Sequence, residues 1–200
     1  MKGTTQKKTI VHHFIKELVQ IYPQSLRTFL RKGDFVLKPQ RFLDGEKIDG
    51  SYDIETGEII LWEPDLEDRE GLFLIITHEW GHKIYHERLS GHEIEKWLRI
   101  RSFEKIDFDL KMAYPAVKHP EEEFCTLFSL VSLVRYWNKK GMKTRSKKLA
   151  AKLRSEFPRA TRSIEKYISK KSPRPKNAGN HITHTEVEKL KAWVNKAIAN

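Results

Sequence analysis

The sequence is poor in cysteine and lacks any long apolar run. Cys125 is the single cysteine among 200 residues, which excludes an internal disulfide and a multi-cysteine zinc site and favours a reducing compartment. Histidine and charged side chains interrupt residues 10–19, so the N-terminus does not resemble a secretory signal, and no apolar stretch approaches the length that spans a bilayer. These absences predict a soluble, cytoplasmic protein that has no membrane partner.

Acidic residues are scarce in one part of the chain, residues 139–176. This segment holds fifteen Lys or Arg against two Glu, a net charge of +13, although the whole chain has a formal net charge of +11. The rest of the molecule is therefore slightly acidic. A segment of this polarity forms either a solvated surface or an appended function such as nucleic-acid binding, and the sequence leaves both open.

The hydrophobic content of 38% predicts one compact core with appendages, in a mainly helical α+β fold. Short β-prone runs at 35–37, 51–54 and 58–62, with a turn at 55–57, predict a small antiparallel sheet or hairpin. A helix over 72–89 follows, and it should be buried because it is apolar on nearly every face. The expected division comprises N-terminal helices over 1–33, a central domain over 34–138, a basic helical extension over 139–171, a linker over 172–183 and a C-terminal helix over 184–200.

The buried helix contains His78-Glu79-Trp80-Gly81-His82, a histidine pair at helical spacing. Four residues make about one turn, so both imidazoles can reach one zinc ion at about 2.1 Å, with Glu79 beside them. Two histidines and a glutamate inside so apolar a helix need partners, which a metal would supply. We therefore expect one Zn²⁺ per chain, with His78 and His82 as ligands and Glu79 as the catalytic base.

His86 continues the same row of histidines along the helix. A separation of eight residues at 1.5 Å per residue puts it about 12 Å from His78 along the helix axis, too far for the two to share one ion. We therefore expect His86 to be a surface histidine.

A catalytic zinc needs a third protein ligand and one open position. The best candidates are the three acids at residues 121–123, which begin an apolar helix. Glu122 shares its helix face with the small side chains of Cys125 and Ser129, whereas the other two acids lie over large apolar residues. A face of small residues lets this helix approach the histidine pair, which favours Glu122. The alternative is a helix N-terminus whose acids simply suit the helix dipole.

The two motifs together resemble the gluzincin clan of metallopeptidases, and especially the small archaeal minigluzincins. In that family a segment of the form Pro-x-Glu-Asp-Phe-Ala-Glu-x-Phe supplies the zinc-binding glutamate. The segment Pro120-Glu-Glu-Glu-Phe-Cys-Thr-Leu-Phe128 is similar to it and has Glu122 in the ligand position. The chain departs from the family at Thr126, where an acid usually supports a zinc-bound histidine.

The resemblance implies a zincin-like metallopeptidase core, and it covers roughly residues 50–137. It further implies that the hairpin over 51–62 offers a sheet edge, which in the family holds an extended peptide substrate by strand addition. The N-terminal helices and the basic C-terminal third lie outside it.

A competing resemblance makes His92 the alternative third ligand. The segment Gly91-His92-Glu-Ile-Glu-Lys-Trp97 is similar to the third-ligand segment of SprT-like proteases, which digest proteins crosslinked to DNA. The basic segment would suit such a substrate. However, the spacing is shorter than usual in that family, and the glycine after the histidine is absent.

The expected function is that of a zinc metalloendopeptidase, in which a zinc-activated water attacks a peptide or protein substrate. Tyr114 and His119 are candidates to stabilise the oxyanion. The rival hypothesis from another class is a basic nucleic-acid-binding protein whose zinc site is structural or vestigial. A further hypothesis is latency, in which the C-terminal segment covers the cleft. The oligomeric state is left open.

Overall fold

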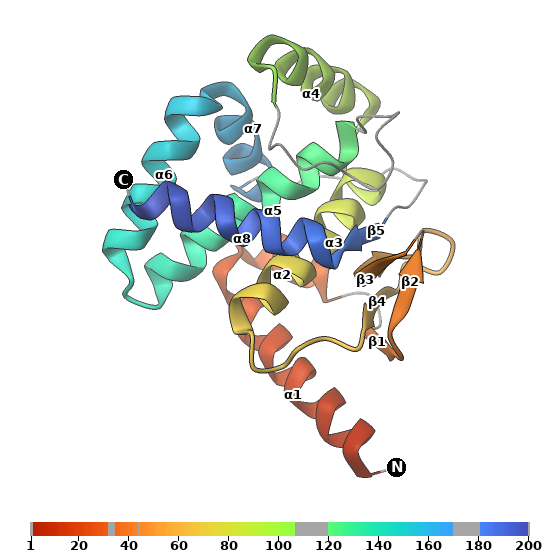
Figure 1. The fold of residues 1–200 in the computed structure, drawn as a ribbon. Helices are drawn as coiled ribbons and strands as arrows, with labels where there is room; N and C mark the ends of the chain where they lie inside the picture. The colour runs from red at the N-terminus through yellow and green to blue at the C-terminus, as the bar shows by residue number, and fades with distance from the viewer. Residues whose placement is uncertain (1, 32–34, 44, 107–119, 170–180, 200) are drawn as a thin grey trace.

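Helices make up most of the chain, and a small mixed sheet lies at one side of the molecule (Figure 1). The structure, a computed structural model, describes residues 2–31, 35–43, 45–106, 120–169 and 181–199. The helices are α1 (Lys2–Leu18), the short 3₁₀ helix η1 (Val19–Ile21), α2 (Gln24–Leu30), α3 (Arg69–Glu87), α4 (Gly91–Glu104), α5 (Pro120–Lys139), α6 (Lys143–Glu156), α7 (Pro158–Ser169) and α8 (His184–Ala199). The strands are β1 (Phe35–Lys38), β2 (Arg41–Leu43), β3 (Glu46–Tyr52), β4 (Ile59–Trp62) and β5 (His181–Thr183). Among these helices, none combines the length and the apolar character needed to cross a membrane.

The sheet confirms the expected α+β class but differs from the expected sheet in its first strand. β3 and β4 form the antiparallel hairpin that the sequence predicts. The sheet is nevertheless mixed, because β1 lies parallel to β4 on the side away from β3. The first hairpin strand ends at Tyr52, earlier than expected. The chain turns there because Asp53 Oδ1 accepts hydrogen bonds from the backbone N–H groups of Glu55 and Thr56.

Strand β3 has neighbours on both of its edges. Ile48 is opposite Arg41 of β2 and also opposite Thr183 of β5. Gly50 is likewise opposite both Leu61 of β4 and Ile182 of β5. The edge of β3 that faces away from β2 and β4 is therefore paired with the antiparallel strand β5. In the hairpin that the family resemblance assigns to a substrate, β3 is thus paired with β5 on its outer edge, and β4 is paired with β1.

Helices α3 and α5 form the centre of the molecule and pack closely along each other. Asp68 caps α3 by accepting a hydrogen bond from the backbone N–H of Gly71, and every residue of 71–86 is buried. At the crossing, a Cβ on Gly81 would lie 2.7 Å from the Cα of Cys125. This contact confirms the prediction that small residues on α5 permit a close approach to α3.

The basic segment belongs to the same hydrophobic core as α3. Its helices α6 and α7 pack on α5, and α7 also packs on α4. The apolar side chains of this segment that are buried in the common core are Leu149, Leu153, Phe157, Ile164 and Ile168. Several of its cations pair with acids of the chain, as in the ion pairs Lys140–Glu17 and Arg145–Glu70. The boundary between α6 and α7 falls at Phe157 and Pro158, because proline has no backbone N–H to continue the hydrogen bonding of α6.

Helix α8 ties the C-terminus to the central helix and to the sheet. It packs against α3, α6 and β3, and it runs across the molecule in front of α5 in Figure 1. Val187, Leu190 and Val194 are buried on its inner face. Lys191 forms an ion pair of 2.6 Å with Asp68, the residue that caps α3.

Candidate metal centre

Helix α3 brings His78, Glu79 and His82 together inside the protein. Their exposed fractions are 2%, 0% and 0%. The rings of His78 and His82 lie one helical turn apart, with centroids 4.9 Å from each other. The predicted single face for the two imidazoles is therefore present, and it is buried.

Glu122 of α5 lies opposite both imidazoles, as the helix-face argument predicts. Its Oε2 is 3.0 Å from His78 Nε2, and its Oε1 is 3.5 Å from His82 Nε2. Ligand atoms about 2.1 Å from one tetrahedral ion lie about 3.4 Å from each other, so each of these two separations, taken singly, is of the size expected for a pair of ligands to one zinc ion. Among the described residues, the groups whose single ligand atoms all lie within 4.8 Å of one another are His78, His82 and Cys125, and His82, His86 and Glu121. Within the described residues, His82 Nε2 is buried and has no hydrogen-bond partner. A buried nitrogen in that position is one that a metal ion would satisfy. We refer to His78, His82 and Glu122 as the metal cluster.

Glu121, the residue before Glu122, contacts the opposite side of the same histidine. Its Oε1 lies 2.6 Å from His82 Nδ1 and 2.5 Å from His86 Nε2. Burial alone would raise the pKa of Glu121, but the hydrogen bonds from the two histidines lower it to about 2. An ionised carboxylate only accepts, so a hydrogen bond to Glu121 requires the proton on His82 Nδ1 and on His86 Nε2.

His86 is not the surface histidine that the sequence suggested. It is 7% exposed, and its ring stacks on that of Tyr52 of β3, with centroids 6.4 Å apart. As expected, His86 is too far along α3 from His78 for the two to share one ion. Its burial depends on contacts with β3 and with the start of α5, which a helical projection of α3 alone does not contain.

Cys125 is a second neighbour of the histidine pair that the sequence argument missed. A ligand atom each from His78, His82 and Cys125 can be chosen so that all lie within 4.8 Å of one another. Burial and the nearby carboxylates, chiefly that of Glu122, raise the pKa of the Cys125 thiol well above its usual range. A bound metal ion would itself deprotonate a coordinating thiol, so Cys125 is an alternative third ligand beside Glu122, which the helix-face argument favours. The usable signal was the position of Cys125 on the helix face of Glu122.

Strand β3 lies directly over Glu79. A Cβ on Gly50 would stand 2.9 Å from Glu79 Oε1 and 2.7 Å from a methyl group of Ile75. Only glycine allows the backbone of β3 to lie this close to the carboxylate. Gly50 is also the residue opposite Ile182 of β5, so the C-terminal strand runs past the same position.

The remaining candidates from the sequence have other surroundings. Glu123 accepts hydrogen bonds from the guanidinium of Arg101, including one of 3.0 Å from Nη2. Thr126 is 2% exposed. His92 is exposed at the start of α4. The two candidates for stabilising an oxyanion, Tyr114 and His119, lie outside the described residues.

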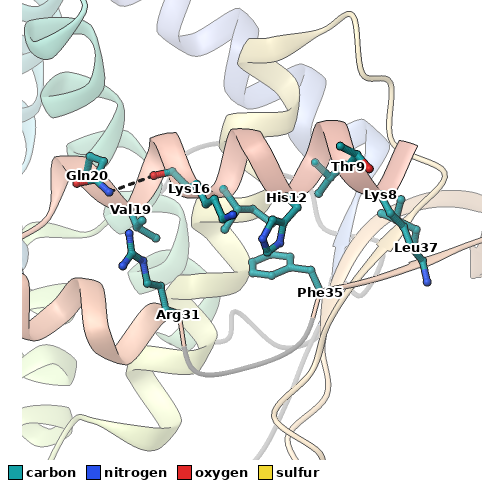
Figure 2. A pocket seen from close by; sticks show the side chains of 11 residues that line it. Lys8, Thr9, His12, Lys16, Val19, Gln20, Arg31, Phe35 and Leu37 are labelled. Carbon is teal, nitrogen blue, oxygen red and sulfur yellow. Dashed lines mark hydrogen bonds between the residues drawn. The ribbon is translucent and has the colours of Figure 1, made fainter. Parts of the chain in front are cut away.

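A hollow of about 860 Å³ lies elsewhere, between α1 and β1, and shares no residue with the metal cluster. Figure 2 shows side chains of α1, among them His12 and Lys16, facing it together with Phe35 of β1. The basic side chains around it are Lys8, His12, Lys16 and Arg31. The hollow is therefore a feature separate from the metal cluster.

Comparisons of the chain with models of protein families, with curated proteins and with solved structures found no match.

Proposed function

We propose that the protein is a zinc-dependent metalloendopeptidase, as the resemblance to gluzincins implies. The observation that carries this proposal is the convergence of His78 Nε2 and His82 Nε2 on the buried carboxylate of Glu122, at 3.0 and 3.5 Å. Two imidazoles and one carboxylate are a ligand set of catalytic zinc sites that keep an open position. The cluster would hold one zinc ion between α3 and α5.

A zinc ion held there would supply Lewis acidity, since zinc lowers the pKa of bound water to about 7 and polarises a carbonyl. Glu79 would take the proton from the attacking water and return it to the leaving amine. The Glu79 carboxylate lies beside the two histidines on α3 and is fully buried. Its burial excludes bulk water from the proton transfer. Gly50 lets a backbone strand lie within contact distance of this carboxylate.

The third ligand is tested by zinc binding. Glu122→Ala is expected to lower zinc affinity by more than about 100-fold, because loss of a direct ligand should exceed the cost of losing an outer hydrogen bond. His92→Ala should leave affinity and the stoichiometry of one ion unchanged. Both are measured by competition with a chelating dye, with circular dichroism as the check on folding. Loss of zinc from His92→Ala but not from Glu122→Ala would favour the SprT-like alternative. Cys125→Ser, measured alongside, tests the thiol as a ligand.

Strand β5 is expected to restrict peptide hydrolysis. A peptide that adds to β3 beside Gly50 must replace β5, which now pairs with that edge. Ile182→Pro removes a backbone N–H from β5 and should weaken the pairing, so the rate of peptide cleavage should rise. Ile182→Val keeps the N–H and is the matched control. Hydrogen exchange would show whether β5 is released in Ile182→Pro. If it is released and the parent, Ile182→Pro and Ile182→Val still cleave peptides at equal rates, β5 does not restrict hydrolysis.

A further inference from the structure

Glu121 is placed to act on the metal cluster without belonging to it. It stands one residue before Glu122 on α5 and contacts His82 from the side opposite to Glu122. Its Oε1 accepts from His82 Nδ1 over 2.6 Å and from His86 Nε2 over 2.5 Å. The side chain is 13% exposed, so little water competes for these hydrogen bonds.

The two nitrogens of His82 cannot both face a cation while the ring is neutral. A neutral imidazole carries one proton, so the nitrogen that binds a metal is bare and the other nitrogen donates. With a zinc ion in the metal cluster, the bare nitrogen of His82 would be Nε2, since this is the atom turned toward Glu122. A second ion among His82, His86 and Glu121, although their ligand atoms lie within 4.8 Å of one another, would require His82 to lose both protons. Hydrogen bonding is therefore the role that fits Nδ1.

His86 holds the carboxylate of Glu121, and this carboxylate in turn orients His82. The His86 ring stacks on Tyr52 and is nearly parallel to the His82 ring, with an interplanar angle of 3° and centroids 6.5 Å apart. Tyr52 in turn donates a hydrogen bond of 2.6 Å to Glu87, which also pairs with Lys83. The carboxylate of Glu121 is thus held between two ordered imidazoles and has little freedom to rotate away from Nδ1.

We propose that Glu121 is the positioning residue of the metal cluster: it sets the tautomer and orientation of His82, and His86 holds it in place. The proposal rests on the function proposed above. In the family that the chain resembles, an acid at the position of Thr126 supports a zinc-bound histidine. Glu121 would supply that support in this chain. Outer carboxylates of this kind fix the ligating histidine and raise its basicity as a ligand.

Glu121→Gln tests the proposal, with Glu123→Gln as the matched control. Both changes remove one carboxylate from the first turn of α5, but that of Glu123 accepts from the guanidinium of Arg101. Zinc affinity should fall about 10- to 100-fold in Glu121→Gln and stay unchanged in Glu123→Gln. Long-range ¹⁵N–¹H NMR on the zinc-loaded proteins should show His82 protonated only at Nδ1 in the parent and a mixture of ring states in Glu121→Gln. A purely structural role for Glu121 would not change this tautomer.

The outcomes separate this proposal from the proposed function. A parent protein that binds no zinc would remove the proposed function and this proposal with it. One zinc ion bound equally tightly, with the same His82 tautomer, in parent and Glu121→Gln would overturn the positioning role alone. Two ions in the parent and one in Glu121→Gln would also overturn it, since Glu121 would then be a ligand. If Glu121→Gln does not fold, Glu121→Asp is measured in the same way, and its shorter arm should give a smaller loss of affinity.

Discussion

Glu79→Gln is expected to lower the rate of peptide hydrolysis by about a thousandfold, within the range that a general base contributes. The amide has nearly the shape of the carboxylate but cannot accept the proton of the attacking water. Zinc should still bind at the stoichiometry of the parent, because Glu79 is not a member of the metal cluster. The rate is measured as kcat/KM on a mixture of quenched fluorescent peptides, and zinc content is measured on the same samples.

The matched control for Glu79 is Glu70→Gln, on the same helix. Glu70 pairs with Arg145 and lies outside the metal cluster, so the cleavage rate of this variant should stay within a few fold of the parent. If the parent cleaves too slowly to measure, the comparison is made in the Ile182→Pro background. Cleavage by Glu79→Gln as fast as by its parent, with zinc bound in both, would refute the proposed mechanism.

Gly81→Ala is expected to destabilise the fold by about 1–3 kcal/mol, the usual cost of extra volume in a packed core. The added Cβ would stand 2.7 Å from the Cα of Cys125 and 2.9 Å from its Cβ. Backbone cannot yield as a flexible side chain does, so α3 and α5 must move apart. For a chain of this size such a loss corresponds to a fall in Tm of roughly 2–4 °C per kcal/mol. Because the same movement separates His82 from Glu122, zinc affinity should fall as well.

Gly91→Ala is the control for this substitution. Gly91 opens α4, and nothing lies within 4 Å of the Cβ that it would gain. Alanine is the better helix former, so Tm should remain equal or rise slightly. Differential scanning calorimetry on the metal-free proteins measures both variants. If Gly81→Ala unfolds at the same temperature as the parent, the crossing of α3 and α5 is looser than the contact with Cys125 indicates.

The arrangement of the metal cluster was predictable because it depends on local periodicity. The spacing of His78 and His82 places both on one face of α3, and the small residues beside Glu122 select the face of α5 that meets it. These features need only helical geometry and side-chain size. The hairpin of β3 and β4 was predictable for a similar reason, since its two strands are joined by a short turn.

What the sequence did not reveal depends on packing between distant parts of the chain. Glu121 was set aside because it projects over large apolar residues of its own helix. From the first turn of α5, however, its side chain reaches Nδ1 of His82 on α3. His86 was expected at the surface because nothing in α3 shows that β3 would cover it. The pairing of β5 with β3 joins segments far apart in sequence, and neither the hydrophobic pattern nor the turn residues of β3 specify it.

The pairing of β5 with β3 also affects the order in which the protein can assemble during synthesis. His184, at the start of α8, hydrogen-bonds to Asp49 of β3, 135 residues earlier in the chain. Domains generally begin to fold from the N-terminal side as the chain is made. A nascent chain that ends before residue 181 already contains Glu79 and the metal cluster, but the edge of β3 beside Gly50 has not yet received its last strand. In the order of translation, the residues of the metal cluster are therefore complete before the strand that covers the neighbouring edge exists.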